Sequence, residues 1–188
     1  ESISYYTNNL EIDSVNPSSD KDIFDKVKDL NKYEGLIWGG SSLNIYSDTK
    51  EIRRQIEFMK ECQKRIKNIL AICWGMQVAV TAAGGVVNRG KNGAHRGIAH
   101  EIVINPDGLN HPIYKDKDKI FNTPAFNYDE VVTLPKNAIL LSSNKVNNVM
   151  ALNFETEFSK IWGIQYHPEI TYEKMITLIK FRRKRLLE

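Results

Sequence analysis

The stretch that most constrains the fold is residues 69–77, which read Ile69-Leu70-Ala71-Ile72-Cys73-Trp74-Gly75-Met76-Gln77. An apolar run typical of a buried strand ends at Cys73, and the segment after it favours a helix. A strand that turns sharply into a helix places one side chain at the tip of the turn, and Gly75 keeps the turn uncrowded. A cysteine at that tip lies at a helix N-terminus, which favours the reactive thiolate. Cys73 is therefore a candidate nucleophile; the alternative is a small buried apolar residue.

The segments before this elbow alternate between strand and helix patterns. Residues 33–38 end in a continuous apolar run, as expected of a strand in a parallel sheet. Residues 49–67 carry apolar side chains along one stripe, which predicts an amphipathic helix. We also expect a short strand at residues 10–15 and a helix at residues 22–30. This order predicts an α/β sheet, in which ligands bind at the C-terminal ends of the strands.

The second half of the chain has a different pattern. Short strand-like runs are separated by Gly, Asn, Pro and Asp, which predicts an antiparallel section. The expected strands are residues 86–88, 99–105, 119–121, 130–134, 139–143, 149–154 and 161–166. Residues 89–97 are rich in glycine and basic side chains, and we expect a mobile loop there. A helix is expected at residues 172–187, and its basic run 182–185 is either a solvated helix end or a partner surface.

Composition narrows the class of protein. The 188 residues are 41% hydrophobic and 26% charged, which is ordinary for one soluble globular domain, and the net charge of +3 is too small to indicate nucleic-acid binding. No apolar run approaches the roughly 18 residues that a membrane helix needs. The two cysteines do not suggest a disulfide framework, so we expect a reducing, cytoplasmic setting. His95, His100 and His111 lack metal-ligand spacing, and we expect neither metal nor cofactor.

Two further motifs fit a nucleophilic cysteine. In Tyr166-His167-Pro168-Glu169, the side chains of His167 and Glu169 point the same way if the segment is extended, and Pro168 favours that conformation. A base beside an orienting carboxylate is what a cysteine nucleophile requires. Gly39-Gly40-Ser41-Ser42 follows the strand at 33–38, and its glycines allow a backbone N–H to be aimed at a ligand.

These motifs, in this order, resemble the class I (triad) glutamine amidotransferase domains over nearly the whole chain. The sequence Cys73-Trp74-Gly75-Met76-Gln77 is similar to the family's Cys-x-Gly-x-Gln elbow, and His167-Pro168-Glu169 is similar to its His-Pro-Glu signature. Within the family, the glutaminase domain of GMP synthase is the most similar. The resemblance implies a flavodoxin-like, mostly parallel sheet flanked by helices, with an antiparallel section in the second half. It also implies one domain over residues 1–188 whose first strand is missing, so we expect a trimmed N-terminus.

The resemblance implies a glutaminase. Cys73 would attack the side-chain amide of glutamine, His167 would carry the proton to the leaving ammonia, and Glu169 would hold the tautomer of His167. Water would then hydrolyse the γ-glutamyl thioester. The ammonia would pass to a synthetase in the same chain or in a partner protein.

The resemblance also implies binding residues. The oxyanion would accept hydrogen bonds from the backbone N–H of Trp74 and from that of Gly40 or Ser41, and Gln77 would contact the bound glutamine. The amino-acid end of the substrate would meet the segment Asn127-Tyr128-Asp129.

This last segment departs from the family pattern, where GMP-synthase-like domains carry a Ser-His-Gly-Asp type sequence. Asn127 replaces the histidine and Tyr128 replaces the glycine, while Asp129 fits. Because a tyrosine there could reshape the pocket, a stand-alone hydrolase of another γ-glutamyl amide is the alternative to a glutaminase. A silent regulatory or binding protein is a third hypothesis, against which the intact Cys73, His167 and Glu169 argue. The sequence does not indicate the oligomeric state.

Overall fold

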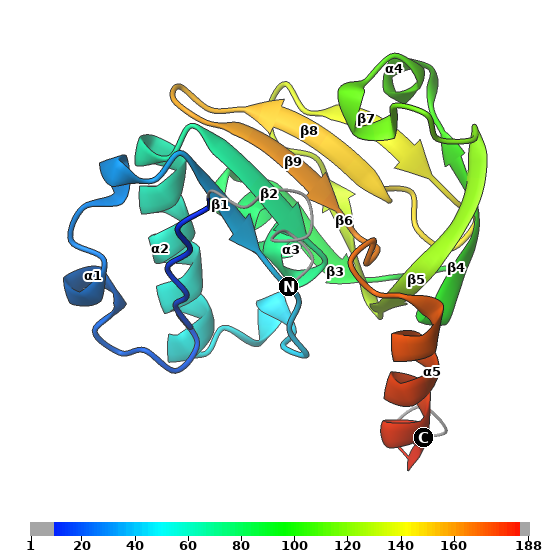
Figure 1. Ribbon diagram of the computed structural model, residues 1–188, viewed down its shortest axis with the longest axis horizontal. Helices are drawn as coiled ribbons and strands as arrows, with labels where there is room; N and C mark the ends of the chain where they lie inside the picture. Colours follow the sequence, from blue (N-terminus) through cyan, green and yellow to red (C-terminus); the bar gives the residue numbers. More distant parts are fainter. Residues whose placement is uncertain (1–9, 185–188) are drawn as a thin grey trace.

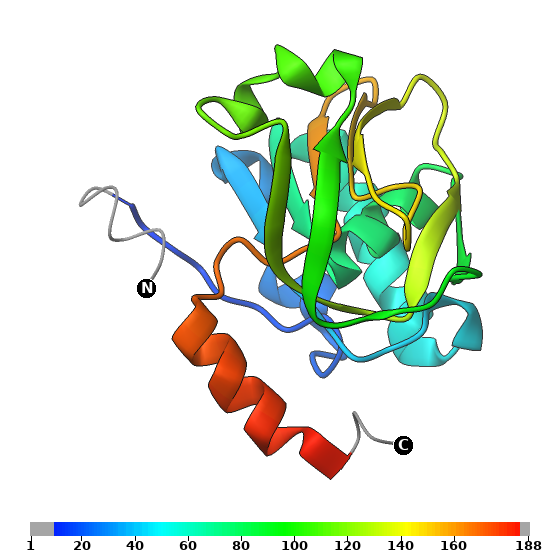
Figure 2. The ribbon, with the colours of Figure 1, turned by 90° about the vertical axis from the view of Figure 1, so that its right-hand side faces the viewer.

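The computed structural model describes residues 10–184, which form a curled seven-stranded sheet with helices beside it (Figures 1 and 2). The strand order is β1-β2-β9-β8-β7-β4-β5, and a second sheet pairs β3 with β6. The bounds of the large sheet are β1 (Gly35–Trp38), β2 (Asn68–Ile72), β9 (Lys160–Ile164), β8 (Ala151–Glu155), β7 (Ile139–Ser143), β4 (His95–Ile104) and β5 (Ile120–Asn127). The small sheet consists of β3 (Val86–Arg89) and β6 (Asp129–Thr133).

The large sheet has a parallel and an antiparallel part. β2 pairs in parallel with β1 and with β9, whereas β9/β8, β8/β7, β7/β4 and β4/β5 are antiparallel pairs. The expected α/β class, with an antiparallel section in the second half, is confirmed. β9 is the last described strand in sequence, yet it lies inside the sheet between β2 and β8.

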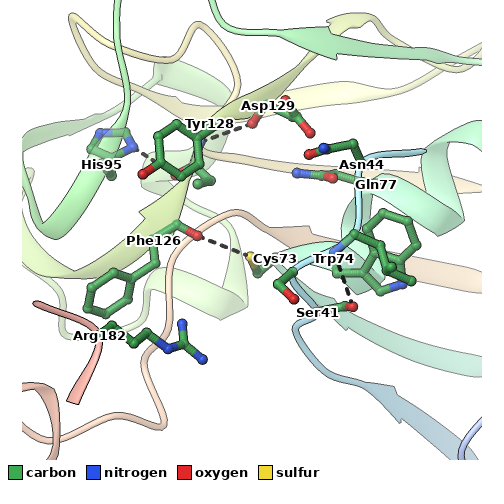
Figure 3. A pocket seen from close by; sticks show the side chains of 13 residues that line it. Ser41, Asn44, Cys73, Trp74, Gln77, His95, Phe126, Tyr128, Asp129 and Arg182 are labelled. Carbon is green, nitrogen blue, oxygen red and sulfur yellow. Dashed lines mark hydrogen bonds between the residues drawn. The ribbon is translucent and has the colours of Figure 1, made fainter. Parts of the chain in front are cut away.

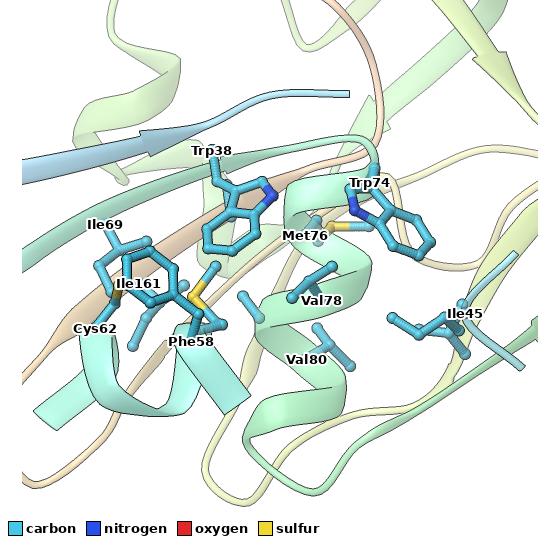
Figure 4. Close-up of a cluster of buried hydrophobic side chains, with 14 of the residues drawn as sticks. Trp38, Ile45, Phe58, Cys62, Ile69, Trp74, Met76, Val78, Val80 and Ile161 are labelled. Carbon is cyan, nitrogen blue, oxygen red and sulfur yellow. The ribbon is translucent and has the colours of Figure 1, made fainter. Parts of the chain in front are cut away.

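Two helices cover the parallel part. α3 (Trp74–Ala82) packs against β1, β2 and β9, and α2 (Lys50–Arg65) packs against α3. The Thr49 hydroxyl accepts a hydrogen bond from the N–H of Ile52, which caps α2 close to the predicted start. The buried stripe of α2 joins the apolar cluster of Figure 4, which holds Trp38, Phe58, Cys62, Ile69, Trp74, Met76 and Ile161.

The N-terminal predictions are partly wrong. Residues 10–15 form no strand, because no neighbouring strand pairs with them, and Leu10 and Ile12 stay exposed. The helix expected at residues 22–30 is only the single turn α1 (Ile23–Lys26). A separate 3-10 turn, η1 (Leu30–Lys32), follows because the Asp29 carboxylate accepts the N–H of Asn31 and starts a new element.

The loop predicted at residues 89–97 is present but shorter than predicted. β3 extends to Arg89 and β4 begins at His95, so only residues 90–94 are loop. β5 is longer than predicted and contains Pro124, which an edge strand tolerates because it need not donate on its outer side. The carbonyl of Pro124 accepts the N–H of His167, 2.8 Å away, and so joins β5 to the segment after β9.

The remaining helical elements are short, except for the last. They are α4 (Pro106–Leu109), η2 (Ile45–Ser47), η3 (Pro112–Tyr114) and α5 (Tyr172–Phe181). α5 projects from the body of the molecule and buries Met175 (Figures 1 and 2). The predicted end of this helix, residues 185–187, lies outside the described residues. Within residues 10–184, no helix is both long and apolar enough to cross a membrane.

Candidate active site

The elbow places Cys73 in a conformation that few residues adopt. Cys73 has φ 54° and ψ −106°, between the end of β2 and the first residue of α3, as the predicted strand–turn–helix requires. Its N–H donates to the carbonyl of Ile164 in β9 over 2.7 Å. A Cβ on Gly75 would overlap the carbonyl oxygen of Trp38, so only glycine lets α3 start this close to β1.

His167 and Glu169 form a close pair beside this elbow. His167 Nδ1 lies 2.6 Å from Glu169 Oε1. A Cβ placed on Gly40 would lie 3.0 Å from His167 Cε1 and 3.8 Å from Cys73 Cβ, so the Gly-Gly turn lies next to both side chains. Burial lowers the pKa of His167, but hydrogen bonds with Cys73 and Glu169 and their charges outweigh it and raise the pKa to about 9.

The environment of Glu169 complements that of His167. Burial raises the pKa of Glu169, but the hydrogen bond and the charge of His167 hold this pKa below its ordinary value. The carboxylate thus stabilises the protonated imidazole, and the imidazole stabilises the carboxylate. The pair can hold and return a proton next to the sulfur of Cys73.

Backbone hydrogen bonds join the elbow to the Gly-Gly turn. The N–H of Gly75 donates to the carbonyl of Gly39 over 3.1 Å. Within residues 10–184, the N–H groups of Trp74 and Ser41 have no protein acceptor. The Ser41 hydroxyl accepts the N–H of Leu43 in its own loop. Trp74 is buried and its indole N–H donates to Gln55 over 2.8 Å, which fixes the first turn of α3.

Gln77 reaches Cys73 through a residue that the sequence analysis missed. Gln77 Nε2 donates to Gln165 Oε1 over 3.3 Å, and Gln165 Nε2 lies 3.5 Å from Cys73 Sγ. Gln165 is fully buried, and the carbonyl of Phe126 lies 3.7 Å from the same sulfur. In the sequence, Gln165 is a single amide side chain that directly follows β9 and directly precedes the Tyr-His-Pro-Glu run.

The turn between β5 and β6 carries Asn127, Tyr128 and Asp129. The Asn127 amide is buried, with Oδ1 2.9 Å from His95 Nδ1 and Nδ2 donating to the carbonyl of Asp129 over 3.0 Å. His95 Nε2 lies 3.0 Å from Asn144 Nδ2. His95 and Asn144 are further residues that the sequence analysis missed, and the pairing of His95 with Asn127 across two strands gave no local signal.

Tyr128 and Asp129 face a cleft that Cys73, Gln77, Asn44 and Arg182 also line (Figure 3). Burial raises the pKa of Asp129, although the Tyr46 hydroxyl donates to its Oδ1 over 3.0 Å. The guanidinium groups of Arg89 and Arg96 lie 4.7 Å and 5.4 Å from the centre of the Tyr128 ring. Among residues 10–184, no group of His, Cys, Asp and Glu side chains is arranged to hold a metal ion.

Most of the sequence-predicted residues line one cleft, whereas Gly40, His167 and Glu169 lie beside Cys73 without being among its lining residues. The elbow, the Gly-Gly turn and His167 come together at Cys73. Tyr128 and Asp129, from the turn between β5 and β6, line the same cleft as Cys73 (Figure 3). Asn127 differs from its neighbours, because its side-chain amide is occupied by protein partners.

The comparisons with known proteins show the family of the chain. The family model for class I glutamine amidotransferases matches residues 3–183, and the chain belongs to this family. It is 32% identical over 145 residues to a γ-glutamyl-L-1-hydroxyisopropylamide hydrolase of Pseudomonas sp, covering 76% of this chain and 49% of that protein. It is also 32% identical over 106 residues to a glutamine-hydrolysing GMP synthase component of Methanosarcina acetivorans, covering 56% of this chain and 52% of that protein.

The chain spans about half the length of these two curated relatives. Among solved structures, a glutamine amidotransferase from Thermotoga maritima matches with a TM-score of 0.70 at 19% identity, covering 88% of this chain and 76% of that one. This last similarity supports the fold alone. The resemblance predicted from the sequence motifs is thus confirmed at the level of the family.

Proposed function

We propose that this chain hydrolyses the γ-amide bond of a γ-glutamyl compound, of which glutamine is the simplest, through a thioester on Cys73. One observation carries the proposal: Cys73 stands at a positive-φ elbow, and a Cβ placed on Gly40 would lie within 4 Å of both Cys73 Cβ and the ring of His167, which is paired with Glu169. A nucleophile, a base and an orienting carboxylate in this order define a catalytic triad.

The reaction has two balanced steps. Cys73 Sγ bonds to the amide carbon, the carbon–nitrogen bond breaks, and the thiol proton travels through His167 to the leaving amine. Water then bonds to the same carbon, the carbon–sulfur bond breaks, and a proton returns to Sγ through His167. Because the pKa of His167 is raised to about 9, the imidazole keeps the proton that it receives from Cys73 at neutral pH and can deliver it to the amine.

The cleft also supports the predicted binding roles. The N–H groups of Trp74 and of Gly40 or Ser41 are proposed to donate to the oxyanion, each contributing about 3 kcal/mol by comparison with other oxyanion holes. Asp129, which is buried beside the Tyr46 hydroxyl, is proposed to meet the α-ammonium of the substrate. Gln77, which lines the cleft and donates to Gln165, is proposed to contact the bound substrate, as the sequence analysis predicted.

The amine that leaves in the first step can be ammonia or a larger amine, and each fits a different candidate function. A glutaminase would release ammonia to a synthetase, and the Methanosarcina acetivorans relative is named as part of a glutamine-hydrolysing GMP synthase. A stand-alone hydrolase would release a larger amine to water, and the Pseudomonas relative is named as a hydrolase of such an amide. Tyr128 in the cleft, in place of the family's glycine, favours the second candidate. The free thiols of Cys62 and Cys73 fit a reducing, cytoplasmic setting.

Turnover assays on the purified full chain test the proposal. Glutamate release would be followed from glutamine and, separately, from a panel of γ-glutamyl amides. Replacing Cys73 with alanine should lower kcat by about 10⁴-fold or more, because the covalent route is lost.

The matched control is Cys62→Ala, which removes the other thiol of the chain. Cys62 is buried in α2, and burial raises the pKa of its thiol to about 12, so this variant should keep full activity. If no substrate is turned over and a glutamine-like electrophile fails to label Cys73, the protein is the silent binding protein instead.

A further inference from the structure

The cleft has a second charged group on the other side of Cys73. In Figure 3, Tyr128 and Asp129 lie on one side of the cysteine and Arg182 lies on the opposite side. A substrate whose scissile amide sits at Cys73 must extend both ways, with its glutamyl head toward one side and its leaving amine toward the other.

The side around Asp129 holds the group proposed to meet the amino end of a glutamyl head. The Asp129 carboxylate suits the α-ammonium group, and Arg89 lies close enough to Asp129 to act on its charge. Arg89 and Arg96 contact the Tyr128 ring but are not among the residues that line the cleft. The α-carboxylate of a glutamyl head is bonded to the same carbon as its α-ammonium, so a head held at Asp129 keeps both charges on that side of Cys73, away from Arg182.

Arg182 is tied to the catalytic segment through α5. The helix starts shortly after Glu169, where the Thr171 hydroxyl accepts the N–H of Lys174. Near its C-terminal end, Ile179 packs against β4, since a Cβ on Gly97 would lie 3.3 Å from Ile179 Cδ1. Arg182 follows this contact as the C-cap and reaches the cleft from there.

The Arg182 guanidinium is available for an anion. Within the described part of the chain, no carboxylate lies within 4.0 Å of it, whereas Arg53 binds both oxygens of Asp48 at 2.7 Å. A guanidinium presents a planar pair of N–H groups that fits a carboxylate with two parallel hydrogen bonds.

We propose that Arg182 binds a carboxylate carried by the leaving amine, so that the preferred substrates are γ-glutamyl amino acids or γ-glutamyl peptides. This inference rests on the proposed hydrolysis at Cys73. The chemistry of the bond cleavage is unchanged, and the released amine is an amino acid or a peptide in place of ammonia. Arg182 then sets specificity, because glutamine offers no group that reaches it.

A pair of substrates that differ only in charge tests this inference. γ-Glutamylglycine has a terminal carboxylate, and γ-glutamylglycinamide is its neutral counterpart. The native chain should show the higher kcat/KM for γ-glutamylglycine, and Arg182→Ala should lower the ratio of the two kcat/KM values about 5- to 10-fold, since a partly exposed charge pair is involved. Arg182→Lys should restore part of the ratio, and added salt should reduce it in the native chain.

Arg183→Ala is the matched control, because Arg183 is an exposed neighbour that does not line the cleft. It should leave the ratio unchanged. An unchanged ratio in Arg182→Ala, or an equal loss for both substrates, would overturn the inference, the latter because Arg182 would then contact the shared glutamyl head. If neither substrate nor glutamine is turned over by the native chain, the proposed function itself fails, and the inference fails with it.

Discussion

The elbow at Cys73 and the turn at residues 127–129 face each other across one cleft, but they are held by different interactions. The elbow is fixed by backbone hydrogen bonds, from Cys73 to Ile164 and from Gly75 to Gly39, and by the lack of space around Gly75. The turn is fixed by side-chain amides and a histidine, with Asn127 bonded to His95. Backbone contacts and steric exclusion do not titrate, whereas a network of polar side chains can be lost one bond at a time.

This difference suggests that the elbow and the 127–129 turn have separate roles, one in the proposed catalysis and one in the proposed substrate recognition. The reacting atoms stand on the part that tolerates the least displacement, because catalysis depends on their spacing. The proposed recognition of the substrate depends on the 127–129 turn, whose side chains can change without a change in the backbone. Variants of the elbow and of this turn should therefore alter different properties, namely stability, the rate of reaction and substrate binding.

The largest expected effect is a loss of stability from Gly75→Ala. The added methyl group would overlap the Trp38 carbonyl at the contact between α3 and β1, which cannot move without breaking the sheet edge. We expect the free energy of unfolding to fall by about 3 kcal/mol or more, measured by urea denaturation. Gly39→Ala is the control, since a Cβ there meets nothing within 4 Å. Equal stability of the two variants would show that the elbow is not held by this contact.

Glu169→Gln should affect activity more than stability. The carboxylate supports the raised pKa of His167, so its loss should lower kcat/KM about 100-fold. The sign of the pH effect follows from the raised pKa. His167 keeps its proton up to about pH 9 in the native chain, so activity should decline as the pH rises through that value, and in the variant it should decline at a lower pH. A pH–rate profile that is identical in the variant would refute the role of the pair.

The smallest effect is expected from His95→Ala, in the polar network. Loss of its hydrogen bonds with Asn127 and Asn144 should loosen the 127–129 turn, raising KM about fivefold while kcat changes little. His100→Ala, an exposed neighbour on β4, is the control. A loss in kcat of similar size to that in KM would mean that the network also positions the reacting atoms.

His95 should also make the free energy of unfolding depend on pH. Burial lowers the pKa of His95, so the folded chain keeps this ring neutral while the unfolded chain binds a proton below about pH 6.5. Stability should therefore fall as the pH falls below that value, and His95→Ala should show a smaller fall. Urea denaturation at pH values of about 7 and about 5.5, on either side of the ordinary histidine pKa, measures this difference.

Local patterns predicted the elbow, α2 and the strands of the parallel part, because each depends on residues close together in sequence. The remaining features depend on residues that are far apart in sequence, and local patterns did not predict them. Residues 10–15 alternate like a strand, but no other strand pairs with them. β4 and β5 are longer than predicted because they support each other, and this pairing brings His95 to Asn127 across 32 residues. Gln165 was missed for the same reason, since its partners Gln77 and Cys73 lie on another element.

The place of β9 in the sheet has a consequence for how the protein is made. Cys73 is synthesised long before residues 160–169, yet β2 pairs with β9, and the proposed mechanism needs His167, which follows β9 closely. A nascent chain that has emerged only as far as β8 therefore contains the Cys73 sulfur but not its proposed proton carrier. The last strand must enter between two that are already present, a long-range and slow kind of pairing. Under the proposed mechanism, a nascent chain therefore becomes competent for hydrolysis only after residues 160–169 have been made and β9 has entered the sheet.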